Sequence, residues 1–296
     1  MATVRMTQGM LSNQALTGMQ TGLNRLAKVQ EQLSTGRIIN RSSDDPTGAT
    51  AAMRIRTALA DQAQYERNAD DGLGWLNQID ATLSSATDQV RRSRDIALQG
   101  ANSGAMGPDA RAALATEVDQ IRSGLVSTAN ATYLDRPVFG GVTTNAKAYL
   151  DDGTYSGTPG AVVRTVADGS TIRVDVEGPD AFGTAPDSVF DHLAALSTAL
   201  RAGDQTGITN AVGFLAADGT RITNVQADVG ARTTRVEQAR GAASDSHLRL
   251  TSSLSEIENT DLAKATVDLK LQEVAYQAAL GATSRVMQPS LLDFLR

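Results

Sequence analysis

An aliphatic repeat of seven residues runs through the C-terminal half of this chain. Such a repeat keeps one side of a helix against a partner helix over many turns. At about 1.5 Å per residue, the predicted helix is roughly 75 Å long. The residues between the repeat positions are largely polar or small, so only one face is buried. A helix of this kind favours an extended structure and side-by-side assembly over an enclosed substrate pocket. The eight repeat positions are Ile208, Leu215, Ile222, Val229, Val236, Ala243, Leu250 and Ile257.

A second heptad pattern marks the N-terminus and predicts a helix over residues 7–34. Three glycines within it, Gly9, Gly18 and Gly22, each cost about 1 kcal/mol relative to alanine. We therefore expect this helix to be marginal alone and to depend on partners. Its two apolar series are Leu16 and Leu23, and Met19, Leu26 and Leu33.

Turn residues at positions 35–48 separate this helix from a long one over residues 49–101, in which Trp75 is expected to pack between helices. A shorter helix follows the loop at 102–108. The period then changes to two in residues 172–176, and Asp168-Gly169 precedes this strand as a hairpin turn. Residues 138–183 are therefore predicted to form a small β-rich insertion.

A final helix is predicted over residues 261–287, before Pro289. It carries apolar residues on two sides, so more than one neighbour must bury it. The end of the chain is strongly apolar and also implies a partner. The two helical series are Leu262, Leu269 and Tyr276, and Val267, Leu271, Val274 and Ala278; the apolar tail holds Leu291, Leu292, Phe294 and Leu295.

These patterns predict a mostly α fold: a long antiparallel helical bundle with coiled-coil rods, nested N- and C-terminal helices and a small β-rich insertion. We expect three domains. Residues 1–45 and 258–296 form a terminal coiled-coil domain, residues 46–137 and 184–257 a long-helix bundle, and residues 138–183 a β-rich outer domain.

Composition excludes several classes of function. A net charge of −6 and a pI near 5.0 argue against nucleic-acid binding. The sequence has no cysteine, so it holds neither a disulfide framework nor a thiolate metal site. The sequence contains no run of eighteen apolar residues, so it predicts no membrane span. The first residues do not resemble a cleaved signal peptide.

Candidate catalytic and metal-binding residues have simpler interpretations. The two histidines, His192 and His247, lie far apart in the sequence, and His192 is expected on the polar face of a helix. Asp44-Asp45 precedes a helix, where acidic side chains interact favourably with the positive, N-terminal end of the helix dipole. Asp151-Asp152 precedes a glycine in a turn. We therefore expect no catalytic, cofactor-binding or metal-binding residue, no cofactor and no enzymatic activity.

Short motifs stand near both ends of the chain. At the N-terminus these are residues 30–36, Gln-Glu-Gln-Leu-Ser-Thr-Gly, followed by Ser43-Asp44-Asp45-Pro46. Near the C-terminus they are residues 255–263, Ser-Glu-Ile-Glu-Asn-Thr-Asp-Leu-Ala. Together these motifs resemble the bacterial flagellin superfamily, and residues 255–263 are similar to its C-terminal entry. The Asp-Asp-Pro motif and the ending at residues 289–295, Pro-Ser-Leu-Leu-Asp-Phe-Leu, resemble the branch that joins hook to filament. The β insertion carries no family signature.

The resemblance implies a structural subunit of the flagellum at the hook–filament junction. It implies export without cleavage, an extracellular location and a cytoplasmic chaperone at the C-terminal segment. The implied partners are hook-associated protein 1, flagellin and a ring of about eleven copies of the chain itself. Alternatives are a flagellin, which forms the filament, or an adhesin-like surface protein that uses the insertion. We expect assembly to depend on Leu16, Met19, Leu23, Leu26, Leu33, Leu262, Leu269, Tyr276, Leu291, Leu292, Phe294 and Leu295.

Overall fold

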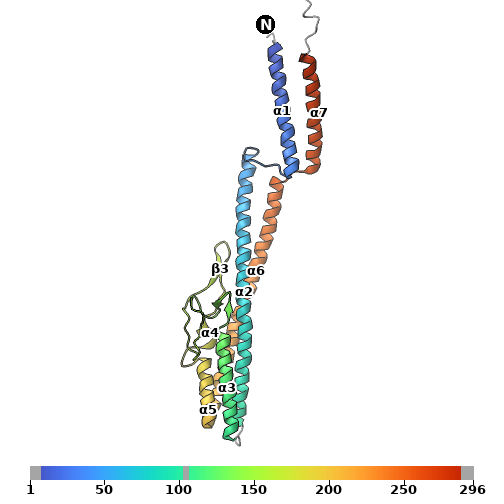
Figure 1. Ribbon diagram of the computed structural model, residues 1–296. Helices are drawn as coiled ribbons and strands as arrows, with labels where there is room; N and C mark the ends of the chain where they lie inside the picture. The colour runs from blue at the N-terminus through green and yellow to red at the C-terminus, as the bar shows by residue number, and fades with distance from the viewer. Residues whose placement is uncertain (1–7, 103–106, 288–296) are drawn as a thin grey trace, which may run out of the picture. The chain divides into compact units, whose positions relative to one another are not determined.

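A computed structural model describes residues 8–102 and 107–287 (Figure 1). The chain divides into two compact units: residues 1–60 with 248–296, and residues 61–247. The first contains α1 (Gln8–Thr35) and α7 (Leu262–Met287), together with the start of α2 (Pro46–Asn102) and the end of α6 (Gln205–Glu258). The mostly helical fold class is confirmed. The three-domain division stays a prediction.

In the second unit, α2 and α6 lie against each other in opposite directions. Arg240 pairs with Asp70 at 3.0 Å, and the Gln226 amide donates to Asp80 at 3.0 Å. Six of the eight predicted heptad positions on α6 are buried, and the last two, Leu250 and Ile257, are half-buried. The facing α2 series is also buried, at Leu76, Leu83, Val90 and Ala97. The seven-residue repeat therefore marks the contact between these helices, as predicted.

Two shorter helices, α3 (Pro108–Ala129) and α5 (Val189–Ala202), pack against each other in this unit. Pro108 suits the first turn of α3, where its missing N–H is not needed. The N-terminus of α5 is a capping box: Ser188 accepts from the Asp191 N–H, and the Asp191 carboxylate accepts in return. At the other end, Gly203 adopts the left-handed conformation that ends the helix.

The insertion contains the predicted hairpin, with β3 (Val163–Ala167) antiparallel to β4 (Ser170–Arg173) and Gly169 at φ 65° in the turn. It also contains α4 (Gly178–Phe182). The buried Asp175 carboxylate ties the segment together, because it accepts from the Val162 N–H at 2.7 Å and from Arg173.

A second hairpin, β1 (Thr132–Tyr133) with β2 (Arg136–Pro137), was not predicted from the sequence. Two-residue strands are too short to show alternation, and its turn residues Leu134 and Asp135 are not glycines, although both have positive φ. The hairpin packs on Trp75, whose ring meets Tyr133 edge-on at 5.6 Å and lies 5.5 Å from the Arg136 guanidinium.

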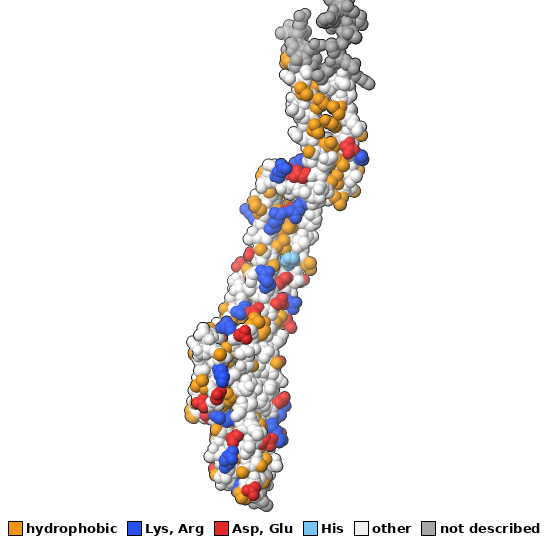
Figure 2. All heavy atoms as spheres, in the orientation of Figure 1, with side chains coloured by type: hydrophobic (Ala, Val, Ile, Leu, Met, Phe, Trp, Pro, Cys, Tyr) orange, Lys and Arg blue, Asp and Glu red, His pale blue; other side chains and the backbone are white. Residues whose placement is uncertain are grey.

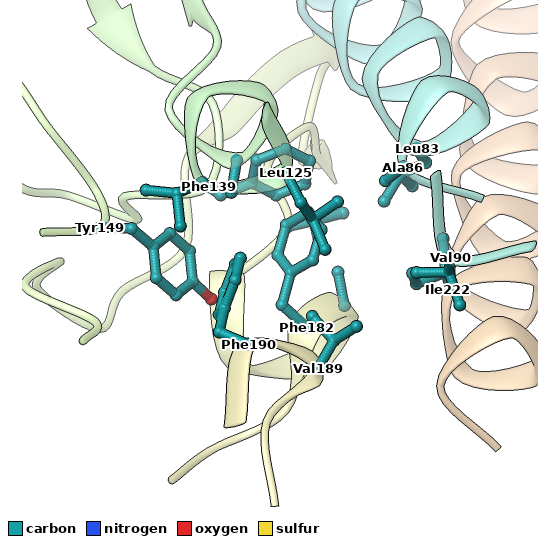
Figure 3. Packing of buried hydrophobic residues seen from close by; sticks show 14 of the residues in the cluster. Leu83, Ala86, Val90, Leu125, Phe139, Tyr149, Phe182, Val189, Phe190 and Ile222 are labelled. Carbon is teal, nitrogen blue, oxygen red and sulfur yellow. The ribbon is translucent and has the colours of Figure 1, made fainter. Parts of the chain in front are cut away.

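Four aromatic residues form one cluster where the insertion meets its supporting helices. Phe139, Tyr149, Phe182 and Phe190 are buried there, with ring centroids 5.1–5.7 Å apart (Figure 3). Leu125 of α3 adjoins the cluster. Large rings supply much buried area per residue. This cluster is what fixes a loop-rich insertion to its supporting helices.

Candidate assembly surface

The terminal helices α1 and α7 run antiparallel, side by side (Figure 1). Met19, Leu26 and Leu33 of α1 are half-buried along this contact, which we call the seam. Leu269 and Tyr276 of α7 are half-buried, with Ala265 almost fully buried. A Cβ atom on Gly22 would lie 3.4 Å from the Tyr276 ring, so Gly22 allows α1 to approach closely.

The two predicted series of α1 have different environments. Met19, Leu26 and Leu33 face the seam, whereas Leu16 and Leu23 are 46% and 47% exposed. On α7, Leu262 is likewise exposed. The sequence grouped these residues as one assembly set, but a pair of helices buries only one side of each.

The other predicted series of α7 is exposed over the whole length that the structure describes. Val267, Leu271 and Val274 are 62–67% exposed, on the side of the helix away from α1. We call these three residues the outer stripe. They were predicted as apolar but were not among the expected assembly residues. Figure 2 shows hydrophobic side chains gathered along this part of the molecule.

The expected residues Leu291, Leu292, Phe294 and Leu295 lie outside the described residues.

A buried carboxylate connects the two pairs of helices inside the first unit. Glu258, the last residue of α6, is 4% exposed, and its side chain accepts from Arg56 of α2 at 2.7 Å. Its backbone oxygen accepts from the Ile38 N–H at 2.7 Å. Arg37 approaches the carboxylate at 3.9 Å, and the N–H of Thr260 donates to Gly36. We call this set the crossover. Sequence reasoning missed it, because Glu256 and Glu258 look alike in a polar stretch.

The two acidic residues near the crossover stabilise the turn before α2 and the start of that helix. The Asp44 carboxylate accepts from Lys28 and from the backbone of Arg41, which lowers its pKa below the ordinary aspartate range. Asp45 accepts from the N–H groups of Thr47 and Gly48 at the start of α2. The predicted capping role is therefore confirmed for Asp45, whereas Asp44 stabilises the turn before the helix.

The expectation for His192 was wrong. It is buried between α5 and α6, with Nδ1 2.7 Å from the Asp218 carboxylate and Phe214 stacked on its ring at 4.7 Å. Burial raises the pKa of Asp218. The apolar spacing of α5 placed His192 on the polar side, but α6 covers that side as well. The pair joins two helices.

The described residues contain neither a cluster of metal ligands nor a membrane-spanning helix. Among them, no group of three or more histidine and acidic side chains could hold a metal ion. Across 8–102 and 107–287, no helix is both long and apolar enough to cross a membrane.

Known proteins share this architecture. Residues 7–141 match the bacterial flagellin N-terminal helical region, and residues 214–295 match the bacterial flagellin C-terminal helical region. Flagellar hook-associated protein 3 of Escherichia coli is 23% identical over 98% of this chain and 99% of its own length. Flagellin FlaB2 of Treponema pallidum is 24% identical over 90% of this chain and 91% of its own.

Two solved structures have the same fold. A putative flagellar hook-associated protein from Vibrio parahaemolyticus superposes with a TM-score of 0.68, at 21% identity, over 73% of this chain and all of that one. The flagellar junction protein FlgL from Legionella pneumophila gives 0.59, at 15% identity, over 71% of this chain and all of that one.

In this fold the N-terminal helix α1 and the C-terminal helix α7 pair and leave apolar residues of both exposed. Both matched regions, which together make up more than half of the sequence, come from one family. The chain belongs to the bacterial flagellin family.

Proposed function

We propose that this protein is the structural subunit that joins the flagellar hook to the flagellin filament. The observation that carries the proposal is the α1·α7 hairpin. It buries one apolar side of each helix and leaves apolar residues on the remaining sides of both helices exposed. Contiguous exposed apolar surface marks an interaction site. A subunit of a closed or helical assembly needs such faces on more than one side.

The relatives favour a junction role over the filament. The E. coli relative, flagellar hook-associated protein 3, aligns over nearly its whole length, and one of the solved structures with this fold is a flagellar junction protein. Flagellin is the second candidate, because flagellins of similar identity, such as FlaB2, also align over most of the chain. The Asp44-Asp45-Pro46 motif favours the junction.

The proposed partners follow from that position. Hook-associated protein 1 lies on the hook side, flagellin on the filament side, and about eleven copies of this chain form the ring between them. The protein travels through the flagellar export channel, held beforehand by a cytoplasmic chaperone at its C-terminal segment, and acts outside the cell. It has no enzymatic activity. The assembly residues are those expected from the sequence, including the seam and the apolar tail, with the outer stripe added.

Deletion of the gene tests the proposal. For a junction protein, cells should carry bare hooks and release flagellin as monomer into the medium, because filament subunits are still exported but have no base on which to assemble. Complementation with the wild-type gene restores filaments and serves as the control. Bare hooks without flagellin in the medium would mean that the chain is itself the filament subunit, and normal flagella would contradict both roles.

A further inference from the structure

The insertion is attached to both long helices of the second unit. At residues 61–75 of α2 and 229–247 of α6, these helices extend beyond α3 and α5, and we call this part the two-helix stretch (Figure 1). Residues 162–176 lie against it and include β3, β4 and the chain that follows β4. We call this segment the strap, because its contacts reach both helices.

Two polar contacts attach the strap to α2. The Arg164 guanidinium pairs with Asp71 at 2.5 Å, and the two side chains are only 26% and 32% exposed. The side-chain amide of Asn68 donates to the backbone oxygen of Thr165 at 2.8 Å. Partial burial makes the ion pair less sensitive to salt than a fully exposed one. One turn of α2 therefore holds β3.

The segment after β4 attaches the strap to α6. Arg232 donates to the backbone oxygen of Asp175 at 2.8 Å and also pairs with Asp228 of its own helix. The Asp175 carboxylate is fully buried and accepts from the Val162 N–H and from Arg173. These partners offset the cost of burying the charge, and they join the two ends of the strap. The strap is therefore a closed loop rather than a flexible arm.

A glycine of α2 lies where the strap and both helices meet. A Cβ atom on Gly72 would lie 3.1 Å from a methyl group of Val174 in the strap and 3.8 Å from one of Val236 on α6. Both valines are fully buried. The absence of a side chain at position 72 allows this close approach of three segments. The strap thus covers a point where α2 and α6 lie close together.

The direct polar contact between α2 and α6 in this stretch is weak. It includes the Arg240–Asp70 pair, whose side chains are 54% and 58% exposed, and exposed ion pairs contribute little. A hollow of about 280 Å³ beside the strap, lined in part by Asn224, Val225 and Asp228 of α6, leaves the packing incomplete. The attachments of the strap therefore matter for holding the stretch closed.

We propose that the insertion is a mechanical strap, which keeps α2 and α6 together while the subunit transmits force. Helices open locally where few buried contacts hold them, and such opening can begin at one turn and spread. A closed loop bonded to both helices couples the turn at Asn68 and Asp71 to the turn at Arg232, so these turns must open together. The insertion then acts within its own subunit rather than toward another protein.

This inference rests on the proposed function for the origin of the force. A subunit between hook and filament carries the drag of the filament when the flagellum turns. Opening of the two-helix stretch can be measured in the purified protein, and that measurement does not depend on where the protein lies in the flagellum. Failure of the strap and failure of the junction role are therefore distinguishable.

Amide hydrogen exchange of the purified full-length protein tests the strap. Arg164→Ala with Arg232→Ala removes one attachment to each helix. We expect exchange in residues 61–75 and 229–247 to become about tenfold faster, with exchange in α3 and α5 unchanged. Arg240→Ala is the matched control, because this arginine of α6 pairs with Asp70 rather than with the strap, and it should leave exchange unchanged. Unchanged exchange in the double variant, or equal acceleration in α3 and α5, would overturn the inference.

A reversible disulfide gives a complementary test, because the chain has no cysteine of its own. Gly72→Cys with Val174→Cys brings two Cβ atoms within reach of a disulfide, in which they are about 3.5–4.5 Å apart. In the background of the two alanine substitutions, the oxidised disulfide should restore slow exchange, and a reductant should reverse the effect. A disulfide that forms but leaves exchange fast would contradict the strap.

Filament retention tests whether the strap resists force in cells. Cells with the two alanine substitutions should carry normal filament numbers in dilute medium and several-fold fewer after swimming in viscous medium, counted by electron microscopy. Arg240→Ala cells should keep their filaments in both media. Equal filament numbers in both media, in a double variant whose two-helix stretch exchanges rapidly, would overturn the mechanical role of the strap and leave the junction role intact.

Discussion

Glu258 is a buried carboxylate in the first unit, which we also call the terminal unit. It is nearly buried, yet only Arg56 is within 3 Å, and that arginine is half exposed. A buried charge needs its partners, because removing a partner leaves the desolvation cost uncompensated. Glu258 therefore connects three segments at once: its side chain joins the end of α6 to the start of α2, and its backbone oxygen accepts from the Ile38 N–H in the linker.

We predict that Glu258→Gln destabilises the terminal unit by about 1–2 kcal/mol, since the charge-assisted hydrogen bond to Arg56 is lost. Urea unfolding followed by circular dichroism would show this as an earlier first transition. Glu256→Gln, on an exposed residue of the same helix, is the matched control and should leave the curve in place. Equal effects of both substitutions would contradict a special role for Glu258.

Asp44 gives a prediction about pH. Its pKa is lowered chiefly by the hydrogen bond from Lys28, so the unfolded state binds a proton more readily than the folded state. The stability that Asp44 contributes is therefore present above the ordinary aspartate pKa of about 3.9 and is lost as pH falls through the lowered value.

Urea unfolding at pH 6 and pH 3 would test this sign. Asp44→Asn should be less stable than wild type at pH 6, and the difference should shrink at pH 3. Asp61→Asn, which removes one exposed charge from α2, controls for net charge. A difference that stays constant or grows on acidification would contradict the assignment.

At the scale of elements, the structure divides the apolar residues of the terminal helices into two groups. Leu26 and Leu269 contribute to the seam within one copy, whereas Val274 belongs to the outer stripe. Substitutions in the two groups should therefore fail in different ways.

We predict that Leu26→Asp separates α1 from α7, because a carboxylate in an apolar seam is uncompensated. Val274→Lys should keep the hairpin paired but block the packing of a neighbour. Both variants should lose filaments in cells. Circular dichroism of the purified proteins should show fewer helical residues for Leu26→Asp alone. Unchanged motility in both variants would contradict the role of the hairpin.

Much of this architecture could be predicted from the sequence, because apolar residues recur at a fixed spacing along a long helix that packs against another helix. Ile222 and Val229 are buried as the seven-residue step requires, and Asp168-Gly169 turns the hairpin. Features that depend on contacts with distant segments of the chain produce no repeating pattern in the sequence and could not be predicted. His192 is buried only because α6 covers it, and the choice between Leu23 and Leu26 as the seam residue depends on where α7 lies.

At the scale of the whole molecule, the two compact units should differ in stability when the protein is free. The second unit holds the aromatic cluster and the buried α2·α6 contact. The first depends chiefly on the α1·α7 pair, which contains several glycines and exposes five leucines, and such short pairs gain most of their stability from neighbours.

Limited proteolysis of the free protein would test this difference. We predict rapid cleavage within residues 1–40 and 260–296, and a resistant fragment that contains most of residues 61–247. The same sites should be protected in the protein on isolated hooks. Resistance of the terminal segments in the free protein would show that the hairpin is stable without neighbours.

The most direct test of the central claim is to locate the protein on the flagellum. Antibodies raised against residues 138–183, with gold labelling and electron microscopy of intact flagella, would show where the copies lie. A junction subunit predicts gold confined to the boundary between hook and filament. Gold distributed along the filament would contradict the junction role and would make the protein a filament subunit.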